Sequence, residues 1–276
     1  MTISVNTNTA ALIALQNLNQ TAGDLSQVQN IISTGLKVST AKDNSSVYAI
    51  AQKQRADLSS LGAVTDSLNR ATSIADVASS AGASISDLLN TLKSKVVAAL
   101  DPSQTGTGRA ALNTDFKSIL NQISLAVSSA SFGGANLLDG SLTNGLSFLA
   151  NADATSHITL STQNLTLGGP NITIAAADDI TSVTNATAVL AKLDASIDKT
   201  NLALAALGTQ STAIDNHAGF VSKLSDSLTV GIGDLVDANL PAESARLSSL
   251  QVKQQLGTQA LSIANQSPQL ILNLFK

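Results

Sequence analysis

Apolar residues at helical spacing fill most of the first half of the chain. Between residues 45 and 100 they recur three or four positions apart, which predicts one long helix that Asp101-Pro102 ends. A shorter stripe over residues 112–127 predicts a second helix after a loop. The two stripes comprise Ile50, Leu58, Leu61, Leu68, Ala75, Ala78, Ile85, Leu89, Leu92, Val96 and Leu100, then Leu112, Phe116, Ile119, Ile123 and Val127.

From residue 131 to residue 179 the apolar period falls to two, which is typical of strands. Leu146, Phe148 and Ala150 alternate with polar residues. The apolar segments 165–167 and 172–174 flank Gly-Gly-Pro-Asn, a pattern that predicts a β-hairpin. The sequence therefore places a small β region inside a helical protein.

Helical periodicity returns between residues 181 and 235, with two apolar seams. One seam follows a seven-residue register that only Thr200 interrupts, and Ser211 is the polar member of the other. Two seams on one helix mean that it touches more than one neighbour, as in a helix bundle. The seams comprise Leu193, Leu207, Ile214, Val221, Leu228 and Leu235, then Leu190, Ile197, Leu204 and Ala218.

Both ends of the sequence show amphipathic helical patterns, over residues 3–36 and 240–276. Pro241 fits a first helical turn or a break, and Pro268 is expected to kink or end the last helix. The apolar positions are Val5, Leu12, Leu15, Leu18, Leu25, Val28, Ile32 and Leu36, then Leu240, Leu247, Leu250, Leu261, Ile263, Leu270, Ile271, Leu274 and Phe275.

Neither end is expected to fold alone in water. Roughly ten large apolar side chains per end, at about 1.5–3 kcal/mol each, contribute about 15–30 kcal/mol if fully buried. Ordering the backbone of some 35 residues costs about 1–2 kcal/mol per residue. The apolar faces therefore need partners, either on other subunits or within one intramolecular bundle.

Composition narrows the classes of protein. With 12% charged and 2% aromatic residues against 43% apolar ones, the sequence suits closely packed helices better than a compact enzyme. A net charge of −4 excludes the basic field that would hold nucleic acid or an anionic membrane. The absence of cysteine excludes disulfides and thiolate sites. Because Lys37 is the first basic residue, no secretory signal peptide is predicted.

Candidate chemistry is sparse. His157 and His217 lie in no metal-binding or catalytic spacing, and Gly106-Thr-Gly108 lacks the lysine of a phosphate loop. We therefore expect no catalytic residue, no metal site and no cofactor. A helical enzyme would need a pocket with converging titratable groups, which the sequence does not offer.

Five segments of the sequence stand out together: Ile3–Thr9, Ile32–Lys37 with Ser39–Asn44, Ser131–Leu138, Gln254–Leu261 and Ala264–Leu270. In this order they resemble the flagellin family. The first three are similar to the family's opening, its "LSSGLR…SAKDD" motif and its "FNGVNLL" element, and the last two resemble its C-terminal helix.

This resemblance implies a mainly α-helical fold in which the N- and C-terminal halves form a long-helix bundle and coiled coil, with a small β-hairpin region in the middle. Residues 1–40 and 239–276 would form an inner coiled-coil domain. Residues 41–238, with the β region at about 131–179, would form an outer helical domain without large insertions. The apolar positions of the two ends, Phe275 and Leu240 aside, would then form the polymer interface.

The resemblance also implies polar and modified positions. Lys37, Lys42 and Asp43 would lie at a domain joint or contact another subunit, although Lys42 and Asp43 also fit a simple charge pair at a helix start. Hydroxyl groups in the polar β region are candidate O-glycosylation sites: Thr155, Ser156, Thr159, Ser161, Thr162 and Thr166.

As a flagellin the protein would polymerise with itself and with related flagellins into an extracellular filament. Its other partners would be an export chaperone, the type III export gate, the filament cap and the hook-junction proteins. Thr91 and Ser94 stand where the pattern read by an animal flagellin receptor has Arg and Glu, which weakens that expected interaction. A hook–filament junction protein, which shares helical termini with flagellins, is the alternative.

Overall fold

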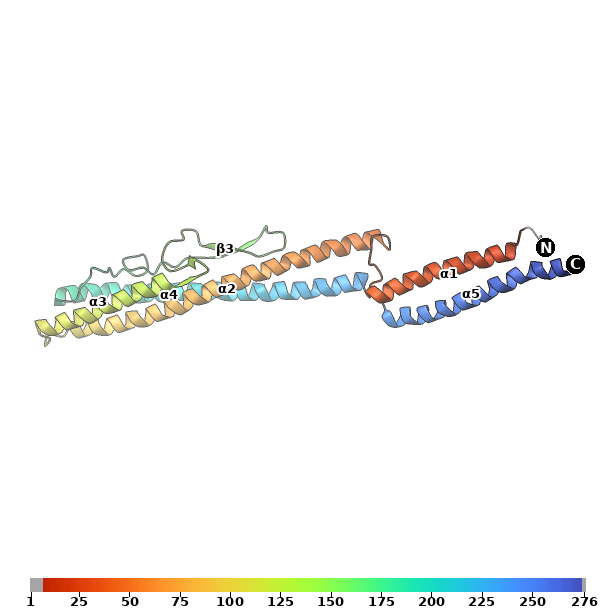
Figure 1. The fold of residues 1–276 in the computed structure, drawn as a ribbon. Coiled ribbons are helices and arrows are strands. Elements are labelled where there is room, and N and C mark those ends of the chain that lie inside the picture. The colour runs from red at the N-terminus through yellow and green to blue at the C-terminus, as the bar shows by residue number, and fades with distance from the viewer. Residues whose placement is uncertain (1–6, 275–276) are drawn as a thin grey trace. The chain divides into compact units, whose positions relative to one another are not determined.

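The computed structural model describes residues 7–274, and side chains over residues 7–266. Its helices are α1 (Thr9–Thr34), α2 (Ser45–Ala99), α3 (Gly106–Ser129), α4 (Val183–Val236) and α5 (Leu240–Leu274) (Figure 1). Four short strands lie between α3 and α4: β1 (Ser131–Phe132), β2 (Ala135–Asn136), β3 (Leu146–Leu149) and β4 (His157–Leu160). The predicted mainly α fold with a small central β region is thus confirmed. Within residues 7–274, no helix has the length and apolar character needed to cross a membrane.

The described residues divide into two compact units. One combines the residues up to Ala56 with those from Ser227 onward, and the other spans Asp57–Asp226. Because the first unit joins the two ends of the sequence, helices that are far apart in sequence share one packing environment there.

Antiparallel helices build the Asp57–Asp226 unit. The α2 and α4 side chains meet through Ser86 and Asn201 (3.2 Å) and through the Lys93–Asp194 ion pair (2.8 Å). The α3 helix joins α2 through the Lys95–Asp115 ion pair (2.7 Å). Between the helices lie fully buried apolar side chains, the largest of which include Leu68, Ile85, Leu89, Leu92, Phe116, Leu120 and Ile123.

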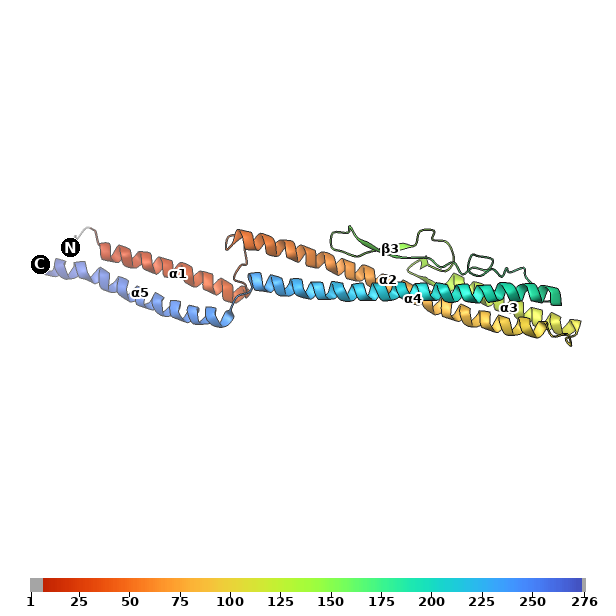
Figure 2. The same ribbon diagram turned by 180° about the vertical axis from the view of Figure 1, so that it is seen from behind.

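Two antiparallel pairs, β1–β2 and β3–β4, form the β region of the same unit (Figure 2). In the larger pair, Leu146 faces Leu160 and Leu149 faces His157. The hairpin is fixed to the helices because the Leu149 amide donates to Ser67 Oγ at 3.1 Å and His217 Nε2 lies 2.6 Å from the Ala150 carbonyl oxygen. His217 therefore has a structural contact.

The hairpin predicted over residues 165–174 is wrong. That segment has one isolated bridge, Leu167 to Ile172, and no strand pair. The Gly168 amide donates to the Ile174 carbonyl at 2.8 Å, but the donors that a ladder would need next bond outside the segment. The Thr173 amide donates to Ser196 Oγ of α4 at 3.0 Å, and the amide of Ala175, directly after the segment, donates to Asp178 Oδ2 at 2.9 Å. Three of its apolar side chains are fully buried, and burial against the helices prevails over a ladder of its own; they are Leu165, Ile172 and Ile174.

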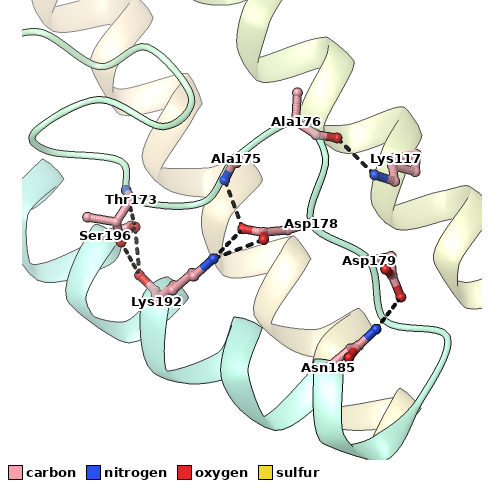
Figure 3. Close-up of polar contacts among 9 residues, drawn as sticks. All are labelled: Lys117, Thr173, Ala175, Ala176, Asp178, Asp179, Asn185, Lys192 and Ser196. Carbon is pink, nitrogen blue, oxygen red and sulfur yellow. Dashed lines mark hydrogen bonds and ion pairs between the residues drawn. The ribbon is translucent and has the colours of Figure 1, made fainter.

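Polar contacts fasten the segment that leads into α4 (Figure 3). Lys192 of α4 forms an ion pair with Asp178 at 2.9 Å, and Lys117 of α3 donates to the Ala176 carbonyl at 2.8 Å. Asp179 accepts from Thr181 Oγ1 at 2.6 Å and from Asn185 Nδ2 at 2.8 Å. Since these donors favour the charged carboxylate, they lower the pKa of Asp179 from 3.8 to about 2.

We expect an Asp179→Asn variant to lose only the part of stability that depends on this charge. The depressed folded pKa means that the contribution is present above the ordinary value of 3.8 and is lost as pH falls through about 2. The difference in melting temperature between wild type and variant should therefore shrink on acidification, as calorimetry would measure. A difference that stays constant down to pH 2 would contradict the assigned hydrogen bonds.

The two prolines of α5 compare differently with their predicted effects on the helix. Pro241 occupies the first helical turn, as predicted, where the missing N–H has no helical partner. Pro268 does not end the helix, which was one of its two expected effects, because α5 continues to Leu274. The helix continues past Pro268 because its other turns keep their hydrogen bonds, so that it tolerates the loss of the one bond that proline cannot donate.

Candidate polymer interface on the terminal helices

The α1 and α5 helices pack against each other in antiparallel orientation within the unit that joins the two ends of the sequence. Asn8 Nδ2 donates to the Ala264 carbonyl at 2.8 Å, so the start of α1 lies beside the later turns of α5 (Figure 1). A Cβ at Gly257 would lie 3.2 Å from Leu18 Cδ1, so the bare glycine permits close approach. The oxygen of the Asn8 side-chain amide accepts from the Ala11 amide at 3.0 Å and caps α1.

This pairing buries few of the predicted interface residues. Val28 is fully buried and Leu250 is 6% exposed. Another group is only half-buried: Leu18, Leu25, Ile32, Leu36, Leu247 and Leu261. The two helices therefore cover one part of their apolar surface by packing on each other.

A second part of that surface stays exposed. Leu12, Leu15 and Ile263 are 59%, 42% and 60% exposed. Val5 lies outside the described residues, and Leu270, Ile271 and Leu274 lie outside the described side chains. Exposed large side chains of this kind mark interaction surfaces when they are grouped.

Sequence reasoning missed three further exposed apolar residues on these helices. Ile13 is 60% exposed, Val252 54% and Leu256 64%. The prediction followed one stripe per helix, whereas these residues lie beside the stripe. The i, i+4 spacing of Val252 and Leu256 was the available indication.

Some of these apolar residues line two grooves along the α1–α5 pair. Leu12, Leu15 and Leu261 contribute to one groove, and Ile13 and Ile263 to the other. Only amide and hydroxyl groups, among them Asn8, Asn17 and Asn265, add polarity to the linings. Grooves of this composition fit apolar side chains of another helix, and they offer no titratable group for catalysis.

The segment after α1 is tied to the end of α4 inside the same unit. Gly35 ends α1 with φ 72°, and its carbonyl accepts from the Ala238 amide at 2.9 Å. The Lys37 amide donates to the Val236 carbonyl at 2.7 Å, and its Nζ to the Asp234 carbonyl at 2.8 Å. A cation at the C-terminal end of a helix is favoured by the helix dipole.

Asp43 organises the turn before α2. Its Oδ2 accepts from the amide and hydroxyl groups of Ser39 and Thr40 at 2.9–3.1 Å. These bonds, that of the Thr40 amide foremost, hold the pKa of Asp43 below its ordinary value. Lys42 is exposed, and among the described residues it forms no ion pair with Asp43. Asp43 thus shapes the turn.

The candidate glycosylation hydroxyls divide by exposure. Thr155, Ser156, Thr159 and Ser161 are exposed, whereas Thr162 and Thr166 are half-buried. Thr166 Oγ1 donates to Asn164 Oδ1 at 2.6 Å, which occupies its hydroxyl proton.

The remaining candidates show no converging chemistry. His157 is exposed on β4, away from any metal cluster, since the described residues hold no group of three or more metal-binding side chains. Thr91 and Ser94 are both exposed on α2.

Paired terminal helices with open apolar grooves, followed by a helix bundle, define a helical subunit built for assembly. Two family models match the sequence: the bacterial flagellin N-terminal helical region over residues 5–143 and the C-terminal helical region over residues 190–275. The protein belongs to the bacterial flagellin family, and it is a structural subunit of the flagellar filament.

Relatives match along the whole length. The flagellin FljJ of Caulobacter vibrioides is 51% identical over all of this sequence and 99% of its own length. A flagellin of Brucella melitensis is 39% identical over 99% of each sequence. In fold, the protein is similar to a putative flagellar hook-associated protein from Vibrio parahaemolyticus, with a TM-score of 0.60 and 14% identity over 71% of this protein and all of that one. At that identity the likeness concerns the fold alone.

Proposed function

We propose that this flagellin polymerises through the apolar grooves of the α1–α5 pair. The observation that carries the proposal is the exposure of Leu12, Ile13 and Ile263 beside these grooves. Packing of α1 on α5 leaves these side chains in water, and burial against a neighbouring subunit would return about 1.5–3 kcal/mol for each. Contacts that are not closed by rotational symmetry produce a helical filament.

In this proposal residues 1–40 and 239–276 form the inner coiled-coil domain, and residues 41–238 form the outer one. Lys37 and Asp43 set the joint, because their hydrogen bonds hold the segment between α1 and α2 in one conformation. Lys42, exposed on the same segment, is left for a contact with another subunit.

The same proposal covers export and partners. The subunit leaves the cell unfolded through the type III apparatus with the help of a chaperone, and it folds as it joins an extracellular filament used for swimming. The coupling of folding to assembly is supported by the small number of residues that α1 and α5 bury when they pack only on each other.

The subunit would also contact the cap and hook-junction proteins, and it would act without catalysis or cofactor. Thr91 and Ser94, which replace the Arg and Glu of the recognised pattern, would weaken binding by the animal receptor. The 51% identity to a flagellin disfavours the junction-protein alternative.

Truncation tests this function. Purified full-length protein in sulfate, which strengthens apolar burial, should form long tubes that sediment and are visible by electron microscopy. A protein without residues 1–36 and 240–276 should stay in the supernatant. If the full-length protein remains monomeric even when seeded with filament fragments, the proposed assembly is wrong.

A further inference from the structure

One asparagine of the β region differs from the other turn asparagines in its surroundings. Asn144 is exposed in the bend that precedes β3, and Gly145 follows it. This is the single Asn-Gly step of the sequence. Among the described residues the Asn144 side chain makes no hydrogen bond, so its amide carbon is free to turn toward the Gly145 nitrogen.

Other asparagines of the loops and of the β region are held by hydrogen bonds. Asn44 Oδ1 accepts from the Val47 amide at 3.1 Å, and Asn151 Oδ1 accepts from the Thr155 amide at 3.0 Å. Asn164 Oδ1 accepts from the Thr166 amide at 3.0 Å, while Asn136 is buried and donates to Val127. A side chain fixed in this way cannot reach the following nitrogen, and each is followed by a residue with a Cβ.

Hairpin geometry fixes the glycine at position 145. Gly145 has φ +73°, and a Cβ there would lie 2.6 Å from the Leu160 carbonyl oxygen. Both features make any larger residue costly at this position. The fold therefore requires glycine directly after an asparagine whose side chain is unrestrained. Because glycine has no side chain, its backbone nitrogen is the least shielded of any residue.

We propose that Asn144 is a site of spontaneous deamidation in the folded subunit. The Gly145 nitrogen attacks Asn144 Cγ, and the new C–N bond closes a five-membered succinimide. The bond from Cγ to Nδ2 breaks, and ammonia leaves with the proton of the Gly145 amide. Water then adds to either ring carbonyl. The product is aspartate or isoaspartate, and no oxidant, reductant or enzyme is required.

The product changes the hairpin in two ways. It adds one negative charge beside β3 on a protein whose net charge is already −4. In isoaspartate the backbone also gains a methylene directly before the Leu146–Leu160 pair that opens the β3–β4 ladder. The register there depends on pairing residue by residue, so the added atom loosens this end of the hairpin.

The experiment is an incubation of native full-length protein at mildly alkaline pH, followed by peptide mapping with mass spectrometry. We expect the Asn144 peptide to gain the mass of an amide-to-acid change first and to accept a methyl group from an isoaspartate methyltransferase. The Asn44 peptide, also in a loop but held by Val47, is the internal control and should lag several-fold. Raising the pH should speed the reaction, because the Gly145 nitrogen must lose its proton.

An Asn144→Gln variant keeps the exposed amide, but its longer side chain could close only a six-membered ring, which forms far more slowly. Its band should therefore stay unshifted in isoelectric focusing. Equal rates at Asn144 and Asn44 would overturn the proposal. So would an Asn144 peptide that stays intact in the native protein yet reacts in urea, since the fold would then protect it.

Discussion

Replacing Leu12, Ile13 and Ile263 by serine is expected to abolish filament formation while the helix bundle of the unassembled subunit remains folded. The three side chains are about 60% exposed, and surface substitutions away from special features typically change stability by no more than about 0.5 kcal/mol each. Their loss at a subunit contact removes at least about 1.5 kcal/mol each, or about 4.5 kcal/mol in total. That raises the concentration needed for assembly by about 1,000-fold.

Sedimentation across a concentration series measures the loss of assembly. Circular dichroism of the unassembled subunit shows whether the substitutions also reduce its helix content. The matched control replaces the exposed polar residues Gln16 and Gln20 of α1 by serine, which shortens side chains on the same helix without removing apolar surface. Filaments from the triple variant at the wild-type concentration would show that these grooves do not form the polymer contact.

The second large effect is expected inside the helix bundle. Phe116 of α3 is fully buried, and Phe116→Ala should lower the free energy of unfolding by about 3–5 kcal/mol, because the cavity adds to the lost transfer energy. Urea unfolding of a protein without residues 1–36 and 240–276 measures this in the absence of assembly. Leu125→Ala on the same helix is the control, since Leu125 is 65% exposed and should cost far less. Equal losses for the two variants would contradict the assignment of Phe116 to the core.

The helices were predictable because their evidence is local. The stripe that ends at Leu100 predicted α2 to within a residue, and Asp101-Pro102 marked its end. Seven-residue spacing predicted the seam of α4 that contains the buried Leu193, Leu207 and Ile214. Each of these assignments rests on the period of a helix, which neighbouring residues express without help from the rest of the sequence.

The β region was predictable only in outline. Residues 146–160 formed the hairpin, while the Gly-Gly-Pro-Asn segment did not, although its turn composition is the stronger local indication. The Thr173 amide, which would donate to the opposite strand in a hairpin, donates instead to Ser196 Oγ, on a helix more than twenty residues away in sequence. A partner so distant in sequence leaves no trace in the turn itself.

Local periodicity is enough to predict that this flagellin has long helices, a small central β region and apolar stripes at both ends. Which residues of those stripes remain exposed depends on tertiary packing: Val28 and Leu250 are covered when α1 meets α5, whereas Ile13 and Leu256 are left in water. Periodicity fixes which residues share a helix face, but the burial of that face depends on which distant helix packs against it.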